Sequence, residues 1–207
     1  MTDAALAARD GRIGNVAGAV LLGGASRRMG RDKAALAVAG VPGATRTARL
    51  LDNLFDEVLL VGGAAPEDCP GQRVPDEPGP RCALRGLATA LAAASAPRVF
   101  VVATDMPLLT PDLVLALVAW PEADAVVPRA GGRAHPLCAV YARDTVLPVA
   151  RERLAGDDLA LRGVLGAVST AWLESGDVAR VDPAGQALLN VNTPEDLAQV
   201  ERLLSGA

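Results

Sequence analysis

Residues 17–33 read AGAVLLGGASRRMGRDK, an apolar run that ends in a pair of glycines and continues into a basic segment. The apolar part, residues 17–22, has the length and composition of a buried strand. Glycines directly after a strand allow backbone amides to approach a phosphate or a base closely. Ligands of open α/β sheets bind beyond the carboxyl ends of the strands. This stretch therefore predicts such a sheet, with a ligand site at its edge.

The basic segment contrasts with the charge of the whole chain. The 207 residues carry a formal net charge of -4, but this segment contains four cations: Arg27, Arg28, Arg31 and Lys33. The contrast points to a small anionic ligand. A P-loop is excluded because it needs Gly-Lys-Ser/Thr, and the spacing of Gly23 and Gly24 does not supply the dinucleotide fingerprint G-x-G-x-x-G. A glycine-rich turn with a solvated basic face remains the alternative.

The rest of the chain predicts alternating strands and helices. We expect strands at 57–61, 98–103 and 123–127, and helices at 44–54, at 83–94 and from Pro111 to about Trp120 behind an N-cap at Thr110. Weaker strands at 137–141 and 178–181 are expected as antiparallel additions, and 64–80 is expected to be a long surface loop. The last helix should open at Thr193-Pro194. This alternation predicts an α/β, three-layer, Rossmann-like fold with a mostly parallel central sheet.

The composition of the chain predicts its domain organisation and excludes several functional classes. We interpret residues 1–15 as a flexible N-terminal extension without the apolar core of a signal peptide, and residues 16–207 as a single domain. An acidic chain with 2% aromatic residues is not expected to bind nucleic acid in general. No apolar run approaches the ~18 residues that a membrane-spanning helix needs, so we expect a cytoplasmic protein without a membrane partner.

The cysteines do not form a metal-binding pattern. The three cysteines lack a CxxC pair, and His135 is the one histidine of the chain. The sequence therefore predicts no Cys/His zinc site and predicts free buried or half-buried thiols.

Asp105 is the strongest candidate for a metal ligand. It follows the clearest strand of the sequence, in Ala103-Thr104-Asp105-Met106-Pro107, so it should face the same crevice as the glycine-rich loop. Mg²⁺ prefers one or two carboxylates together with phosphate oxygens and water. The alternative is an Asp that caps the following helix, but Thr110 and Asp112 are better placed for that.

The basic segment resembles the L-A-G-G-x-S-x-R-M-G-x-D-K signature of the molybdenum cofactor guanylyltransferase family, with Leu22 where Ala is usual. The resemblance extends from about Val16 to Leu204 and implies a nucleotidyltransferase form of the fold. It implies nucleotide-binding roles for Leu21, Leu22, Gly23, Gly24, Ser26, Arg28, Lys33, Asp76 and Asp105. Arg28 and Lys33 would bind the triphosphate and, with Asp105, form the catalytic set.

Two further segments match the family on the side of the acceptor. Residues 190–196, NVNTPED, resemble N-V-N-T-P-E-x-L, and residues 133–137, RAHPL, resemble a Q/H-P-L segment. The resemblance implies acceptor contacts for His135, Asn190 and Asn192. It also places the asparagines near the metal, where we assign Asn192 beside Asp105 and keep Asn190 as the alternative.

The chain departs from the family pattern at two places. Residues 82–87 read CALRGL where the family has G-P-L-x-G-L, so only the Leu and the Gly-Leu of that pattern are kept. Gly62-Gly63 lacks the polar residue that the family often has after the second strand for contact with the base.

The implied reaction is attack by the terminal phosphate of molybdopterin on the α-phosphorus of GTP, with Mg²⁺ as cofactor and release of pyrophosphate. Related cytidylyltransferases usually have Ala-Gly where this chain has Gly23-Gly24, so the resemblance favours guanine over cytosine. Transient contact with cofactor-biosynthesis or molybdoenzyme-maturation proteins would fit such an activity. Two alternatives stay open: the same chemistry with CTP or with a sugar-phosphate acceptor, and a catalytically silent binding protein that keeps the fold.

Overall fold

The computed structural model describes residues 11–121, 123–156 and 158–205, except 24–36. Its main sheet has the strand order β10-β7-β9-β6-β1-β4-β5, and β8 pairs with β7 off this path. These strands are β1 (Val16–Leu21), β4 (Val58–Val61), β5 (Gln72–Val74), β6 (Arg98–Ala103), β7 (Ala125–Ala130), β8 (Arg133–Ala134), β9 (Cys138–Ala142) and β10 (Thr170–Leu173). A separate hairpin pairs β2 (Ala37–Val38) with β3 (Val41–Pro42).

The sheet is mostly parallel, as the sequence predicts. β5, β4, β1 and β6 run parallel to one another, and β10 runs parallel to β7. β9 lies between β6 and β7 and is antiparallel to both. The expectation of an antiparallel strand at 137–141 is therefore confirmed, with bounds shifted by one residue.

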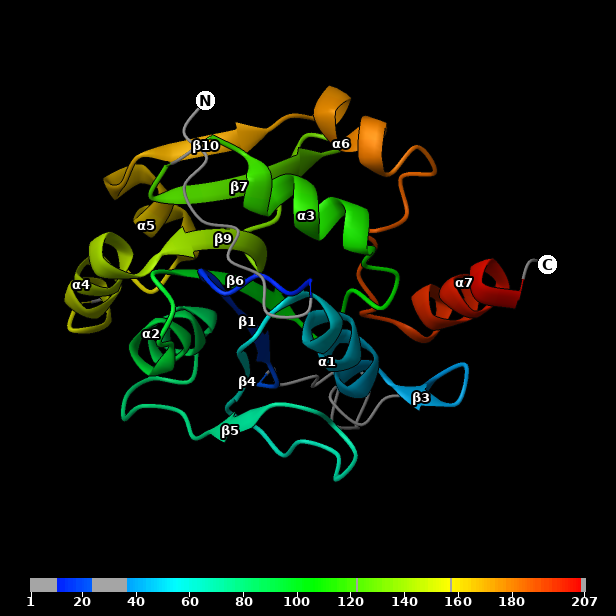
Figure 1. Ribbon diagram of the computed structural model, residues 1–207, viewed down its shortest axis with the longest axis horizontal. Helices are drawn as coiled ribbons and strands as arrows, with labels where there is room; N and C mark the ends of the chain where they lie inside the picture. The colour runs from blue at the N-terminus through cyan, green and yellow to red at the C-terminus, as the bar shows by residue number, and fades with distance from the viewer. Residues whose placement is uncertain (1–10, 24–36, 122, 157, 206–207) are drawn as a thin grey trace.

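Helices cover both faces of the sheet, which makes the fold a three-layer α/β structure (Figure 1). On one face lie α1 (Gly43–Leu54), α3 (Pro111–Ala119) and α6 (Ser175–Val181), and on the other α2 (Ala83–Ala93), α4 (Arg143–Leu154) and α5 (Leu161–Ala167). α7 (Pro194–Ser205) lies beside β2 at the edge of the molecule. Alternate strand residues supply the two cores: Val16 and Val20 face α1, whereas Ala17 and Ala19 face α2.

Gly18 shows why β1 is built from small residues. A Cβ at this position would lie 2.9 Å from Cδ2 of Phe55 and 3.0 Å from Cδ1 of Leu51. The end of α1 therefore packs directly on the backbone of β1. Phe55 also stacks on Phe100, with ring centroids 6.2 Å apart.

Several sequence expectations were wrong. Residues 178–181 lie in α6 rather than in a strand, because Val178 and Val181 are three residues apart and pack together on one core, which is helical spacing. The expected loop at 64–80 contains the edge strand β5, whose short polar sequence gives no strand signal. The sequence predicted no element for α4, α5 or β10.

The N-terminal segment is partly packed against the fold. Ile13, which we expected in the extension, is buried, and its amide donates to the carbonyl of Leu54 at 2.8 Å. Residues 1–10 lie outside the described part.

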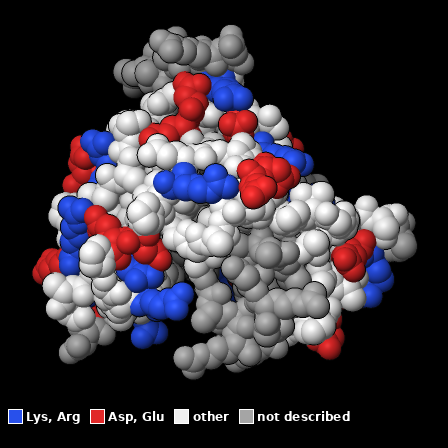
Figure 2. All heavy atoms as spheres, turned by 90° about the horizontal axis from the view of Figure 1, so that it is seen from below, with Lys and Arg blue, Asp and Glu red and all other residues white. Residues whose placement is uncertain are grey.

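The surface carries charges of both signs (Figure 2), and the three cysteines are free. Figure 2 shows acidic and basic side chains interspersed over one face, with no wide area of one sign among the residues it colours. No described helix is long and apolar enough to cross a membrane. Cys69 and Cys138 are free and buried, and Cys82 is free and half-buried, as expected.

Candidate functional site

Four parallel strands end in register at one edge of the sheet. Leu21 of β1 is paired with Val61 of β4 and with Ala103 of β6, and Val61 is paired with Val74 of β5. The chain leaves β1 to form β4 on one side and later forms β6 on the other side. A crevice beyond the carboxyl ends is expected at such a change of direction. Among the described residues, the sequence-predicted Leu21, Leu22 and Gly23 lie at the end of β1, Asp76 lies after β5 and Asp105 lies after β6.

The start of the glycine-rich loop is held by backbone bonds. The amide of Leu22 donates to the carbonyl of Val61 at 2.9 Å, and the side chains of Leu21 and Leu22 are buried. These two residues can therefore meet a ligand only through their backbone. Gly23 is exposed, and a Cβ there would have no neighbour within 4 Å among the described residues. Gly24, Ser26, Arg28 and Lys33 lie outside the described residues.

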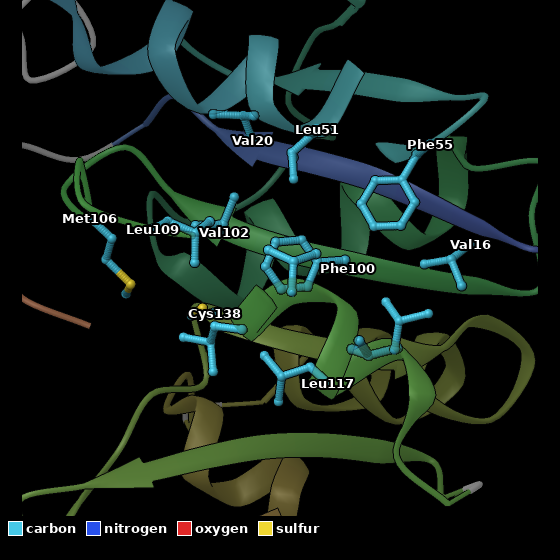
Figure 3. Close-up of a cluster of buried hydrophobic side chains, with 14 of the residues drawn as sticks. Val16, Val20, Leu51, Phe55, Phe100, Val102, Met106, Leu109, Leu117 and Cys138 are labelled. Carbon is cyan, nitrogen blue, oxygen red and sulfur yellow. The ribbon is translucent and has the colours of Figure 1, made fainter. Parts of the chain in front are cut away.

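Asp105 follows β6 at the same edge and is anchored by the core. The next residues, Met106 and Leu109, are buried, and Figure 3 shows their side chains in one cluster with Val102 and Cys138. Asp105 itself is half-buried, and its Oδ1 is inaccessible to solvent. The packing of Met106 and Leu109 therefore holds the backbone of Asp105 in a defined place at this edge.

A backbone hydrogen bond brings the asparagine segment to Asp105. The amide of Val191 donates to the carbonyl of Asp105 at 2.7 Å, although the two residues are far apart in sequence. Val191 is buried, whereas Asn190 and Asn192 on either side of it are exposed. The buried valine thus fixes the segment and leaves both amide side chains at the surface of the site.

The start of α7 holds Asn192 from the other side. Oδ2 of Asp196 accepts from the amides of Asn192 at 2.8 Å and Thr193 at 2.9 Å, and Oγ1 of Thr193 accepts from the amide of Asp196 at 3.1 Å. This is a reciprocal capping arrangement. The expected N-cap at Thr193 is therefore present, and it fixes the segment next to the site.

His135 lies on the far side of β6 from β1, close to Asp105. Its amide donates to Pro128, and its carbonyl accepts from Cys138, which begins β9. Burial lowers the pKa of His135, and the charge of Arg133 lowers it further, against the opposing effects of Ala130 and Asp105. The imidazole is thus neutral at neutral pH.

Burial also raises the pKa of the Cys138 thiol to about 12, which makes it a poor nucleophile.

Asp76 lies at the opposite end of the edge, after β5, and the sequence did not reveal its partner. Nη2 of Arg85 in α2 donates to Oδ2 of Asp76 at 2.6 Å. The interaction joins a loop to a helix, and Arg85 occupies a variable position of the family pattern, so no motif indicated it. Two strands separate β5 from β6, so the ends of the strands that precede Asp76 and Asp105 lie roughly 14 Å apart at ordinary strand spacing.

This separation divides the site into two ends. Asp76 and Asp105 follow strands that are three places apart in the sheet, whereas Asp105 is hydrogen-bonded to the Asn190–Asn192 segment and lies near His135. Among the described residues there is no group of three or more His, Cys, Asp or Glu that could hold a metal. The donor set suits a hard cation that takes one carboxylate from the protein and its other ligands from phosphate and water.

Comparison with known proteins identifies the family of the chain. A profile of the MobA-like NTP transferase domain matches residues 18–171. A probable molybdenum cofactor guanylyltransferase of Chloroflexus aggregans is 36% identical over 200 residues, covering 91% of this chain and 95% of that protein. The molybdenum cofactor guanylyltransferase of Cereibacter sphaeroides is 34% identical over 206 residues, covering 90% and 96%.

A solved structure shares the fold. Molybdopterin-guanine dinucleotide biosynthesis protein A from Archaeoglobus fulgidus superposes with a TM-score of 0.80 at 20% identity, covering 92% of this chain and 100% of that one. At this identity the likeness concerns the fold alone, whereas the profile and the relatives above concern the sequence. The chain belongs to the MobA-like NTP transferase family.

Proposed function

We propose that this protein transfers GMP from GTP to the phosphate of molybdopterin, forming the guanine dinucleotide cofactor and pyrophosphate. The observation that carries the proposal is the joining of Asp105 to the Asn190–Asn192 segment at the edge where β1 delivers the glycine-rich loop. In a chain that matches molybdenum cofactor guanylyltransferases over about nine-tenths of its length, this edge is the natural place for the triphosphate and the metal.

The nucleotide would lie along the edge from Asp76 to Asp105. The backbone of Gly23 and Gly24 would contact the base. Leu21, Leu22 and Ser26 would also bind the nucleotide. Arg28 and Lys33 would bind the triphosphate and take up the negative charge that develops on pyrophosphate as it leaves. Positioning and charge neutralisation then supply the rate enhancement.

Asp105 would hold the metal, with Asn192 or Asn190 beside it. The proposed ion is Mg²⁺, because a single carboxylate with amide oxygens, phosphates and water is the set that this ion prefers. When bound, it would neutralise charge on the phosphates during transfer.

The acceptor would bind on the side of His135, Asn190 and Asn192. A phosphate monoester has a second pKa of about 6, so the attacking group is largely dianionic at neutral pH and needs no base. The lowered pKa of His135 fits this chemistry, since a neutral imidazole can donate a hydrogen bond to the acceptor without acting as its acid.

We further propose that GTP and molybdopterin meet on this protein in the cytoplasm. Handover of the product would need transient contact with cofactor-biosynthesis or molybdoenzyme-maturation proteins.

Calorimetric titration with GTP, CTP, ATP and UTP, each with and without Mg²⁺, tests the choice of nucleotide. We expect GTP to bind most tightly and to depend on Mg²⁺. Preference for CTP would move the product to a cytosine dinucleotide. Binding of none of the four, with molybdopterin present, would contradict the proposal and favour a silent binding protein.

A further inference from the structure

The contact between Arg85 and Asp76 is more than a surface ion pair. Nη2 of Arg85 donates to Oδ2 of Asp76 at 2.6 Å, and Nη1 donates to the carbonyl of Gly79 at 3.0 Å. One guanidinium therefore fixes both ends of the turn that follows β5. The two charged side chains are 14% and 26% exposed, against 55% and 60% for the Arg49–Asp68 pair. Reduced solvent screening makes the former contact the stronger one.

This contact places the carboxylate of Asp76 over Gly62. A Cβ built on Gly62 would lie 2.9 Å from Oδ2 and 3.1 Å from Oδ1 of Asp76. The carboxylate thus occupies the space into which a side chain at position 62 would project. Gly62 also has a φ of +72°, which disfavours most side chains. Asp76 therefore supplies a polar group where the chain lacks one after β4.

The chemistry of a carboxylate restricts what it can meet there. A carboxylate repels phosphate groups, so Asp76 would face the nucleoside rather than the triphosphate. With Oδ2 bound to Arg85, Oδ1 can accept from a neutral donor. Three such donors exist in GTP: the ribose hydroxyls, the N1–H group of guanine and the 2-amino group of guanine.

We propose that Arg85 is a positioning residue for nucleotide binding, which holds the Asp76 carboxylate over Gly62 to accept a hydrogen bond from a neutral nucleoside donor. This inference rests on the proposed function. A detail of Arg85 supports it: the Nε–H group is buried and has no acceptor among the described residues. A buried donor without a partner disfavours the folded state, so stability alone does not account for the arrangement.

Arg151 provides a matched control. It lies in α4 and contacts the same loop at Glu77, the residue after Asp76. Its Nη2 donates to Oε1 of Glu77 at 2.8 Å. Arg151→Met therefore removes an ion pair of the same loop without touching Asp76. We expect Arg85→Met to weaken Mg²⁺-dependent GTP binding about tenfold, because a hydrogen bond to a charged group is lost. Arg85→Lys should recover part of the affinity, and Arg151→Met should stay within about twofold of wild type.

Three analogues identify the donor in the same calorimetric titrations. Inosine triphosphate lacks the 2-amino group, N1-methyl-GTP lacks the N1–H group, and 2′,3′-dideoxy-GTP lacks the ribose hydroxyls. The analogue that lacks the donor should bind wild type more weakly than GTP and should be insensitive to Arg85→Met. If all three analogues bind wild type as tightly as GTP, the inference is overturned.

The remaining outcomes separate this inference from the proposed function. Wild-type protein that binds no GTP contradicts the proposed function itself. If Arg85→Met binds GTP with the affinity of wild type, or if Arg85→Met and Arg151→Met lose equal GTP affinity, the positioning role of Arg85 is overturned. Neither outcome contradicts the proposed function. If Arg85→Met does not fold, Asp76→Asn keeps the volume of the loop side chain, and unchanged GTP affinity in that variant overturns the role equally.

Discussion

Asp105 is the residue on which the metal assignment depends. Its backbone is held by the buried Met106 and Leu109 that follow it and by the hydrogen bond from the amide of Val191. Asp105→Asn should therefore fold normally and reduce transfer at least ~100-fold, because a metal ligand contributes several kcal/mol of charge stabilisation. Turnover and thermal unfolding, measured together, check this.

A nearby aspartate serves as the control for that variant. Asp112 is exposed in the first turn of α3, seven residues after Asp105. Asp112→Asn should keep full activity. Wild-type turnover in Asp105→Asn under saturating Mg²⁺ would remove Asp105 from the site.

His135 makes stability depend on pH in a predictable direction. Burial and Arg133 lower its pKa below the ordinary 6.5, so the folded protein resists protonation more than the unfolded chain does. As pH falls below about 6.5, the unfolded chain takes up a proton first, and this contribution to stability is progressively lost until the folded-state pKa is reached. Above pH 6.5 the contribution is constant.

The variant His135→Gln isolates this effect. Urea denaturation at pH 7.5, 6.5 and 5.5 should show wild type losing more stability than His135→Gln as pH falls. Parallel losses in the two proteins would show that His135 is not the responsible group. Between pH 7 and 8.5, the turnover of wild type should show no titration of a histidine.

At the scale of elements, the start of α7 determines how firmly the asparagine segment is held. Asp196→Ala removes the acceptor for the amides of Asn192 and Thr193. We expect a loss of about 1 kcal/mol in the free energy of unfolding, as for other capping residues, and a higher KM for molybdopterin.

Glu195→Ala is the matched control, because Glu195 lies in the same first turn and interacts with the same helix dipole. The difference between the two variants therefore reports the capping bonds alone. Equal stability and equal KM values in both variants would show that the cap does not support the site.

At the scale of the whole molecule, the sequence predicts most of the architecture. The runs of apolar residues at β1, β4 and β6 indicate buried strands. The N-caps that the sequence predicts at Thr110 and Thr193 are present in the structure. β5 could not be predicted, because its residues, Gln72 and Arg73 among them, are polar and are ordered by pairing with β4. Residues 178–181 of α6 were expected to form a strand because the segment is short and contains two valines.

The site is predictable only where it is local in sequence. Asp105 follows its strand directly, so the edge on which it lies could be inferred. The contact of Val191 with Asp105 and the pairing of Arg85 with Asp76 depend on the packing of distant elements. Neither has a spacing rule in the sequence, and both became visible only in the folded chain. The roles of Arg28 and Lys33 stay predictions, since they lie outside the described residues.

The most direct test of the central claim is a competition assay with molybdopterin, Mg²⁺ and equal concentrations of GTP, CTP, ATP and UTP, with the dinucleotide product identified by mass. We predict the guanine dinucleotide as the main product, with one pyrophosphate released for each product molecule and none formed by Asp105→Asn. A cytosine dinucleotide, or no dinucleotide while GTP is bound, would contradict the account.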